Sequence, residues 1–396
     1  MIAPNLTSVQ INRLLDIKKH LHQHPETSWN ELKTTEFIQT QLRQIDGVEI
    51  LDLGLKTGVV AVIHGARPGK TVALRADIDA LDVDECWPSD TPSLIPGKGH
   101  LCGHDYHTTC LIGAAMLLAQ TRSQWQGSVV LIFQPAEETT NGAPEIIHTG
   151  IFDRYHIEAV FGLHNRPEIE TGKIVVKQGP LMAAKINFSV TVHGVAGHGS
   201  MPHKCVDPIV CAAAVVQNVL TITSRNIDPF KAIVLSICSI HGGTPANLIV
   251  DKVEMTGSMR YLDPEVGKRA LERLQRIIQS TADTFECTAD FEIVEQVHPV
   301  INSEQLYEIA KSAAESILGK NSIVPSESAL ASEDFSAYMQ LVPGFFYWIG
   351  SRKPGDQIYS WHNNYFHVDD NAIPPGSRLL TQSALLWLLQ NLTLEN

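Results

Sequence analysis

The sequence lacks the features that mark membrane, secreted and nucleic-acid-binding proteins. No run of roughly 18 apolar residues occurs, so the sequence predicts no membrane span. The opening stretch MIAPNLTSVQ lacks the basic region and apolar core of a signal peptide, so we expect a cytoplasmic protein. The formal net charge is −13, which makes nucleic acid and anionic membrane surfaces poor partners. An anionic substrate would therefore need a local cationic site.

The sequence also lacks the regular cysteine spacing that is typical of disulfide-rich proteins. Its seven cysteines are scattered at irregular spacings, their number is odd, and no CxxC pair occurs. This argues against a disulfide framework and predicts reduced thiols. Cys102 lies among histidines and is a candidate ligand. Free cysteine behaves as a small apolar residue, so we expect the other six to be buried: Cys86, Cys110, Cys205, Cys211, Cys238 and Cys287.

Length and composition indicate an ordinary globular protein of two domains. The chain has 396 residues, of which 44% are hydrophobic and 18% charged, and it contains no internal repeat. Apolar runs alternate with helical patterns in the first part, which predicts an α/β layer with a largely parallel sheet. The predicted strands are 58–65, 71–77, 128–138 and 159–165; the predicted helices are 8–24, with Ser8 as its cap, and 108–120.

A second pattern starts near residue 183 and predicts a compact α+β domain inserted into the first. Its expected strands are 186–194, 232–243, 252–263 and 288–296, and its expected helices are 207–224 and 264–285. The α/β pattern then resumes, with a buried strand at 344–350. The predicted architecture is therefore a discontinuous domain, 1–182 and 297–396, with an insertion at 183–296.

Polar residues gather at the ends of three predicted strands. Asp77 and Asp79 come at the end of the strand at 71–77, Glu137 and Glu138 end the run at 128–138, and His164 follows AVFGL. Ligands of open parallel sheets bind outside the carboxyl ends of the strands. We therefore expect these acids and this imidazole to meet at one edge of the sheet.

The stretch GKGHLCGHDYHTT, residues 97–109, crowds metal-binding side chains into a glycine-containing loop before a helix. Cys102 and His104 stand two residues apart, a spacing that in a loop can chelate one metal or span two neighbouring metals. Thiolate and imidazole suit zinc and related ions, and carboxylates widen the choice to manganese. We expect Asp105 to orient a neighbouring imidazole rather than to bind a metal.

The adjacent carboxylates Glu137 and Glu138 suit two different roles at such a site. One can bind a metal while the other moves protons, because a metal lowers the pKa of bound water toward ~7 and a nearby base then accepts the proton. The structural alternative is that PAEE begins a helix, where acids are stabilised by the helix dipole.

Ten motifs together carry a family resemblance. They are HLHQHPETSWNE (20–31), LRADIDALDV (74–83), GHLCGHDYHTTCLIGAA (99–115), FQPAEE (133–138), GLHN (162–165), GHGSMPH (197–203), GGTPANLI (242–249), GSMR (257–260), SEDFSAYMQLVPG (332–344) and WHNNYF (361–366). The chain thereby resembles, over nearly its whole length, the metal-dependent amidohydrolases that include N-acyl-amino-acid amidohydrolases, hippurate hydrolases and plant auxin–amino acid conjugate hydrolases. The resemblance implies a zinc-peptidase-like catalytic domain with a two-metal site, and an inserted lid domain that usually dimerises.

The resemblance implies a role for each matching residue. Glu137 would act as the general base and then as the acid for the leaving amine, and Asp77 would orient the site. His362 enters on the resemblance alone. Two divalent metal ions, zinc or manganese with cobalt or nickel as alternatives, would be held by Cys102 as the bridging ligand and by His104, Glu138, His164 and His362.

The inserted domain would contribute three further residues under the same resemblance. His198 would stabilise the oxyanion at the site of a partner subunit, and Asn247 and Arg260 would bind the substrate carboxylate. Arginine suits that task because its guanidinium group forms two parallel hydrogen bonds to a carboxylate. The implied enzyme is a homodimer or homotetramer that hydrolyses the amide bond of small N-acyl amino acids, as aminoacylases and hippuricases do.

Other functions are compatible with the same residues. A metallo-dipeptidase or an N-acetyl-diaminopimelate-type deacetylase would use the same metals with a different pocket. A Cys102 nucleophile without a metal, and a non-catalytic metal- or ligand-binding protein, are further alternatives. The sequence departs from the family at Tyr106, at Asp82 and at Asn363–Asn364, which alters the pocket walls and leaves the implied ligands in place.

Overall fold

The computed structural model describes residues 2–243 and 245–390; position 244, within the motif at 242–249, lies outside them. The chain divides into two compact units. The main unit comprises Met1–Gly179, Ile301–Glu327 and Asp334–Asn396, and the inserted unit comprises Pro180–Val300 and Ser328–Glu333. The chain passes from one unit to the other at β7 (Gly179–Met182), at β14 (Val300–Asn302) and at both ends of the segment Ser328–Glu333.

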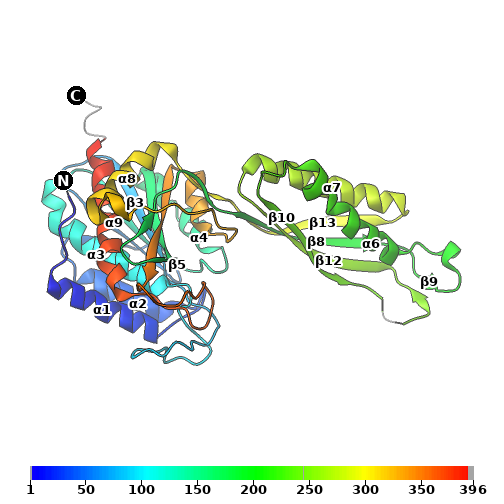
Figure 1. Cartoon of the computed structure of the whole chain (residues 1–396), viewed down its shortest axis with the longest axis horizontal. Helices are drawn as coiled ribbons and strands as arrows, with labels where there is room; N and C mark the ends of the chain where they lie inside the picture. Colours follow the sequence, from blue (N-terminus) through cyan, green and yellow to red (C-terminus); the bar gives the residue numbers. More distant parts are fainter. Residues whose placement is uncertain (1, 244, 391–396) are drawn as a thin grey trace. The chain divides into compact units, whose positions relative to one another are not determined.

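A seven-stranded sheet forms the centre of the main unit (Figure 1). Four neighbouring strands, β4, β3, β5 and β15, run parallel, whereas β2 and β6 are antiparallel to their neighbours. The fold class is thus confirmed as mixed α/β with a mostly parallel sheet. In sheet order the strands are β1 (Val48–Leu51), β2 (Val59–His64), β4 (Ser128–Gln134), β3 (Thr71–Asp77), β5 (Ile157–Glu170), β15 (Gly344–Arg352) and β6 (Ile174–Val175).

The central strands are apolar on both faces because helices cover both faces of the sheet. On one face α3 (His104–Thr121) and α9 (Ile373–Gln390) pack against β3, with α1 (Ser8–Gln23), α2 (Leu32–Arg43) and α8 (Glu304–Leu318) around them. On the other face lie α4 (Gly142–His148), which Figure 1 labels, and packed with it α5 (Ile151–Arg154) and the 3-10 helix η5 (Asp334–Gln340). Nearly every residue of α3 is buried, which explains why its sequence is apolar all round from Cys110 to Ala119.

The first helix begins as predicted, but its cap is Thr7 and not Ser8. The Thr7 hydroxyl accepts the Gln10 N–H at 3.2 Å, and the Gln10 side chain accepts the Thr7 N–H at 2.8 Å. This reciprocal pair satisfies two backbone donors at once, which a cap at Ser8 would not achieve with Gln10.

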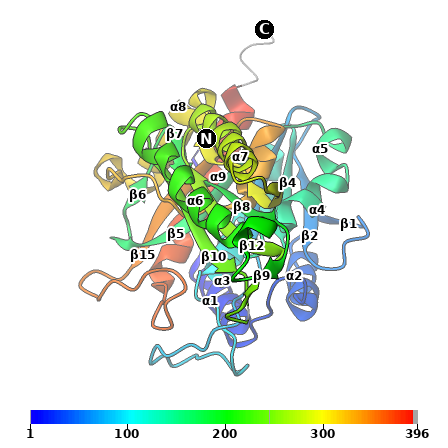
Figure 2. The same cartoon turned by 90° about the vertical axis from the view of Figure 1, so that its right-hand side faces the viewer.

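The inserted unit is a four-stranded antiparallel sheet with two helices on one face, which Figure 2 shows lying side by side. Burial alternates along β8 and β12, because alternate side chains face the helices and the open side of the sheet. The sheet order is β10 (Ile233–His241), β12 (Lys252–Tyr261), β8 (Ala184–His193) and β13 (Thr288–Val297); the helices are α6 (Pro208–Val219) and α7 (Pro264–Thr284), and a separate ribbon pairs β9 (Gly197–His198) with β11 (Leu248–Ile249).

The predicted helix at 207–224 is split. It is α6 as far as Val219, and a π-helical turn, Ile222–Asn226, follows. Among the described residues, Pro208–Asn226 is long and apolar enough to cross a membrane when only length and composition are considered. This is weak evidence, because core helices of soluble proteins meet the same criterion, and Ala212, Val215 and Val219 pack in the core of the inserted unit.

The prediction of six buried cysteines is correct for only half of them. Cys110, Cys211 and Cys287 are buried, whereas Cys86 and Cys238 are exposed and Cys205 is half-buried. The reason is local: Cys86 lies in the long loop after β3, and Cys238 lies on β10, which is an edge strand of its sheet.

Candidate metal centre

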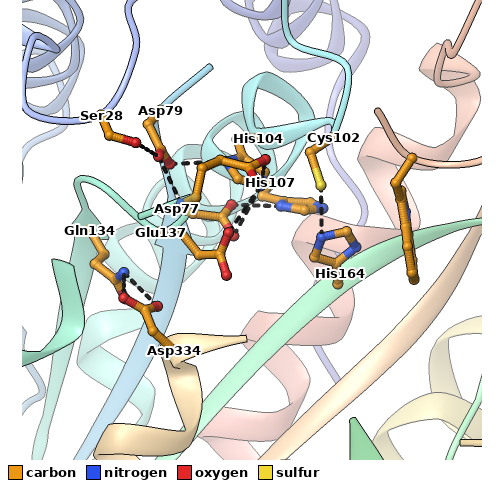
Figure 3. Close-up of polar contacts among 12 residues, drawn as sticks. Ser28, Asp77, Asp79, Cys102, His104, His107, Gln134, Glu137, His164 and Asp334 are labelled. Atoms are coloured by element: carbon orange, nitrogen blue, oxygen red, sulfur yellow. Dashed lines mark hydrogen bonds and ion pairs between the residues drawn. The ribbon is translucent and has the colours of Figure 1, made fainter. Parts of the chain in front are cut away.

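The register of the parallel strands brings the predicted polar residues to one edge of the sheet. Asp77 at the end of β3 is the register partner of Gln134 at the end of β4, so the segments that follow them emerge together. Figure 3 shows Asp77, Glu137 and His104 converging there, with Cys102 beside His164. His164 lies within β5 and not after its end, because that strand continues to Glu170.

Cys102 lies in the loop before α3, whereas His104 lies within α3. His104 is the first residue of α3, so the prediction of a loop through 107 is wrong for its last four residues. Gly103 precedes the helix as its N-cap, with a φ of 85°. A Cβ at this position would come within 2.5 Å of the Asn165 Nδ2 atom, so the turn between the two side chains requires glycine.

The five residues implied as metal ligands lie together. Cys102, His104 and His164 offer ligand atoms that all lie within 4.8 Å of one another, and so do Cys102, Glu138 and His362. Cys102 belongs to both groups, which is the arrangement that a bridging thiolate requires. The His362 N–H donates to the Leu101 carbonyl at 2.9 Å, and this bond ties the loop that carries His362 to the loop that carries Cys102.

The surrounding hydrogen bonds hold Nδ1 of both rings, so Nε2 is the nitrogen of each ring that is left to face the cluster. Nδ1 of His104 donates to Asp79 at 3.1 Å, and Nδ1 of His164 donates to the Asn165 carbonyl at 2.7 Å. Nε2 of His104 is buried and has no hydrogen-bond partner among the described residues. A buried polar atom is costly to leave without a partner, and a bound cation would satisfy this nitrogen, so the donor set fits a metal.

Negative charge dominates the surroundings of His104. Burial by itself would lower the pKa of His104, but the carboxylates of Asp77, Asp79 and Glu138 raise it to about 10. Positive charge is therefore strongly favoured at this position, whether a proton or a metal supplies it. Burial and the nearby His107 lower the pKa of His164 well below its ordinary value, which keeps that ring in the neutral form that binds metals.

His107 supports the site but offers no ring nitrogen to a metal, because both nitrogens make hydrogen bonds. Its Nδ1 donates to Asp77 at 2.6 Å, and its Nε2 accepts the Asn165 N–H at 2.9 Å. Asp77 also pairs with Arg75 at 2.8 Å, and the fully buried Arg75 reaches Asp334 at 3.0 Å. Asp77 thus lies in a buried ion-pair network, the orienting position that the resemblance implies for it.

The two adjacent glutamates lie in a turn and not at the start of a helix. Residues 137–140 form the turn, and α4 begins only at Gly142, so the helix-start alternative is wrong. Ala136, which precedes them, has a φ of 52° and is fully buried. A left-handed conformation costs an alanine roughly 1–2 kcal/mol, so the surrounding structure must hold it in place.

Three buried carboxylates from distant parts of the chain hold the backbone from Ala136 through this turn to the start of α4. Each accepts one N–H group, and none of the three was predicted to have this role. The bonds are Ala136 N–H to Glu31 at 2.8 Å, Glu138 N–H to Asp79 at 3.0 Å, and Ala143 N–H to Asp334 at 3.0 Å. The sequence signal for Glu31 and Asp334 was their membership of the motifs at 20–31 and 332–344, and Asp79 was in addition predicted to lie at this edge of the sheet.

Asp105 orients an imidazole as predicted, but the imidazole belongs to α1 and not to the candidate metal centre. Its carboxylate contacts His22 Nδ1 at 2.8 Å, and the other ring nitrogen of His22 lies 3.0 Å from Glu85. Burial would lower the pKa of His22, but these two carboxylates raise it to about 9. His22 therefore links α1, α3 and the loop after β3.

The other predicted site residues, His198, Asn247 and Arg260, belong to the inserted unit. His198 and Asn247 are close, because Leu248 pairs with His198 and the Gly199 N–H donates to the Asn247 carbonyl at 2.9 Å. The His198 Nδ1 atom accepts the Ser200 N–H at 3.2 Å, which leaves the proton on Nε2, where it can be donated. Arg260 lies on β12 and donates to the Ser332 hydroxyl at 3.0 Å.

Comparison with known proteins places the whole chain in one group. The sequence model of peptidase family M20/M25/M40 matches residues 73–385. N-acetylcysteine deacetylase of Bacillus subtilis (strain 168) is 36% identical over 377 residues, which are 95% of this chain and 97% of that protein. IAA-amino acid hydrolase ILR1-like 4 of Arabidopsis thaliana is 33% identical over 382 residues, which are 95% of this chain and 86% of that protein.

Among solved structures, the YXEP protein of Bacillus subtilis, described as a dinuclear metal-binding peptidase of the M20 family, is similar to this chain. The two share 33% of their residues, with a TM-score of 0.85 over 97% of this chain and 99% of the other. The likeness extends over both units and is not confined to the main sheet.

Proposed function

The chain belongs to peptidase family M20/M25/M40, and from this premise we propose that it hydrolyses the amide bond of N-acyl amino acids with two divalent metal ions. The observation that carries the proposal is the pair of ligand groups that share Cys102, with a further carboxylate, Glu137, at their edge. The names of the deacetylase and of the plant conjugate hydrolase support the substrate class, since both describe removal of an acyl group or of an amino acid at an amide bond.

The proposed metal ligands are Cys102, His104, Glu138, His164 and His362. Thiolate, imidazole and carboxylate together suit zinc or manganese, with cobalt or nickel as alternatives. When bound, such ions supply Lewis acidity, which polarises the amide carbonyl and makes water a better nucleophile. His104 and His164 direct their Nε2 atoms at the proposed metals because Asp79 and the Asn165 carbonyl hold the opposite nitrogens.

Glu137 is the proposed general base and general acid. Its carboxylate is buried and lies 4.0 Å from the Nε2 atom of His104, close to the ligand cluster. In this role it accepts a proton from the attacking water and then donates that proton to the departing nitrogen. The neighbouring Glu138 carboxylate lies 3.4 Å from His362 and is better placed as a ligand.

The inserted unit supplies the proposed substrate contacts. Nε2–H of His198 is a donor suited to a developing oxyanion, and Arg260 and Asn247 suit the free carboxylate of an amino acid. His198 would act in the site of a partner subunit, so we propose a homodimer or homotetramer assembled through this unit.

Release of free amine from a substrate panel tests the proposed reaction. The panel holds N-acetyl, N-benzoyl and longer N-acyl amino acids together with dipeptides, with zinc or manganese supplied. We expect hydrolysis of the acyl amino acids at rates well above those of the dipeptides. Preference for the dipeptides would instead favour a peptidase, which the description of the YXEP protein also allows.

Replacement of Glu137 tests the assignment of the base. The Glu137→Gln variant keeps the size of the side chain but cannot accept a proton, so kcat should fall by about 10²–10⁴-fold. The matched Glu138→Gln variant should instead lower metal content, measured by elemental analysis. Full activity of the Glu137→Gln variant would contradict the role of Glu137 as the base. Full resistance of the wild-type enzyme to chelators would contradict the metal mechanism and favour Cys102 as a nucleophile.

A further inference from the structure

We propose that Glu31 is a positioning residue for Glu137. It holds the buried Ala136 in the left-handed conformation from which the next side chain points into the site. The inference rests on the proposed function only in that Glu137 is taken as the base. Its structural part, the fixing of the Ala136 backbone by Glu31, stands on the hydrogen bond alone.

The first observation is that Glu31 does not perform the ordinary task of its position. It is the N-cap of α2, where an acidic side chain normally accepts an N–H group of its own helix, yet its side chain makes no such bond. Its Oε1 instead accepts the Ala136 N–H at 2.8 Å, 105 residues away in the chain. The carboxylate is therefore diverted from its own helix to the turn that carries Glu137.

The second observation is that the carboxyl group of Glu31 is buried with no cation beside it. Glu31 is 0% exposed, and no ion pair among the described residues involves it. Burial, with the nearby negative charge of Asp79, raises the pKa of Glu31 to about 7. A buried acid is costly unless its hydrogen bonds are made, and the bond to Ala136 is the one that connects it to the active site.

The third observation concerns the strained residue that receives this bond. Ala136 has a φ of 52° and is completely buried. Unlike a glycine, it has a Cβ atom that makes this conformation unfavourable, and water cannot reach its backbone to compensate. The next anchor along the turn is separate, because the Glu138 N–H donates to Asp79. Loss of Glu31 should therefore displace Glu137 more than the proposed ligand Glu138.

Because Glu31 anchors Ala136 and Asp79 anchors Glu138, the substitution of Glu31 should change kcat and leave metal binding intact. Glu31→Met removes the acceptor while keeping the length of the side chain. We expect kcat to fall by about 10–100-fold, the loss typical of a misplaced catalytic group, with KM and metal content close to those of the wild type. Glu31→Gln retains an acceptor oxygen and should keep kcat within about threefold.

A second substitution separates positioning from general loss of stability. Glycine adopts a positive φ without strain, so Ala136→Gly in the Glu31→Met background should recover most of the lost kcat. Ala136→Val alone should lower kcat, because a β-branched residue resists this conformation. The control is Glu36→Met, the same change at an exposed position of α2, which should alter nothing.

Hydrogen exchange gives a readout that does not depend on activity. The segment 133–142 should exchange faster in Glu31→Met and at the wild-type rate in Glu31→Gln. If the wild type hydrolyses no member of the substrate panel but this exchange pattern holds, the proposed function fails and the anchoring role stands. Unchanged exchange in Glu31→Met, or failure of Ala136→Gly to restore kcat, would overturn the inference.

Discussion

At the scale of single residues, the candidate metal centre depends on backbone conformations that only certain residues adopt. Gly103 has a φ of 85°, and a side chain there would collide with Asn165. Gly97 has a φ of 76° in the same loop, but a Cβ at that position would meet nothing within 4 Å. The two positions therefore share a positive φ and differ in the collision that a side chain would meet.

The Gly103→Ala substitution should weaken metal binding by at least about tenfold, because the collision displaces Asn165 and turns Cys102 away from His104. Gly97→Ala carries a similar backbone penalty of roughly 1 kcal/mol but should leave metal affinity unchanged. The measurement is competition for zinc against a chromogenic chelator. Equal affinities in the two variants would show that Gly103 does not set the ligand geometry.

At the scale of secondary-structure elements, α1 is joined to the first turn of α3 by a buried charge pair. His22 lies between Asp105 and Glu85, and its pKa is raised to about 9. Because the folded-state pKa lies above the ordinary value of 6.5, the stabilisation is complete below about pH 6.5 and is lost as the pH rises through 9. The upper limit is about 3 kcal/mol, at about 1.4 kcal/mol for each pH unit.

The His22→Gln variant tests this link through the pH dependence of unfolding. The metal-free wild type should be more stable than the variant at pH 6, and the difference in the free energy of unfolding should shrink toward pH 9.5. Urea unfolding with a chelator present gives both values, since bound metal would add its own stabilisation. A difference that stays constant from pH 6 to 9.5 would show that His22 is neutral in the folded protein.

At the scale of the whole molecule, the chain divides its proposed chemistry between two units. The proposed ligands and the proposed base belong to the main unit, and the proposed carboxylate-binding residues belong to the inserted unit. Arg260 is half-buried on β12, and burial lowers the pKa of its guanidinium, although the group stays charged. Its position in a protein of net charge −13 fits a contact with an anionic substrate.

The Arg260→Met substitution should raise KM for N-acyl amino acids by about 10-fold or more, because a desolvated carboxylate loses its charged partner. The same variant should bind carboxamide analogues, which lack the negative charge, about as well as the wild type does. Steady-state kinetics on the two substrate series separates these effects. An equal rise in KM for both series would assign Arg260 a structural role.

The local sequence was sufficient for many of the elements and for the chemical type of the site, although it gave no helix for α2, α8 or α9. Apolar runs placed β3, β12 and β13 within a few residues, because alternation and helical periodicity are properties of neighbouring residues. Clustering of thiol, imidazole and carboxylate groups at strand ends indicated a metal site, and the motif resemblance, which family membership confirms, added His362.

Only the tertiary structure decided how those residues are held. The bond from Ala136 to Glu31 spans 105 residues, and the bond from Ala143 to Asp334 spans 191. A hydrogen bond between distant residues leaves no periodic pattern in the sequence, so neither carboxylate could be assigned its partner. The sequence alone determined which ligands are available, whereas the folded chain determined the left-handed turn that aims Glu137 and Glu138 at the same point.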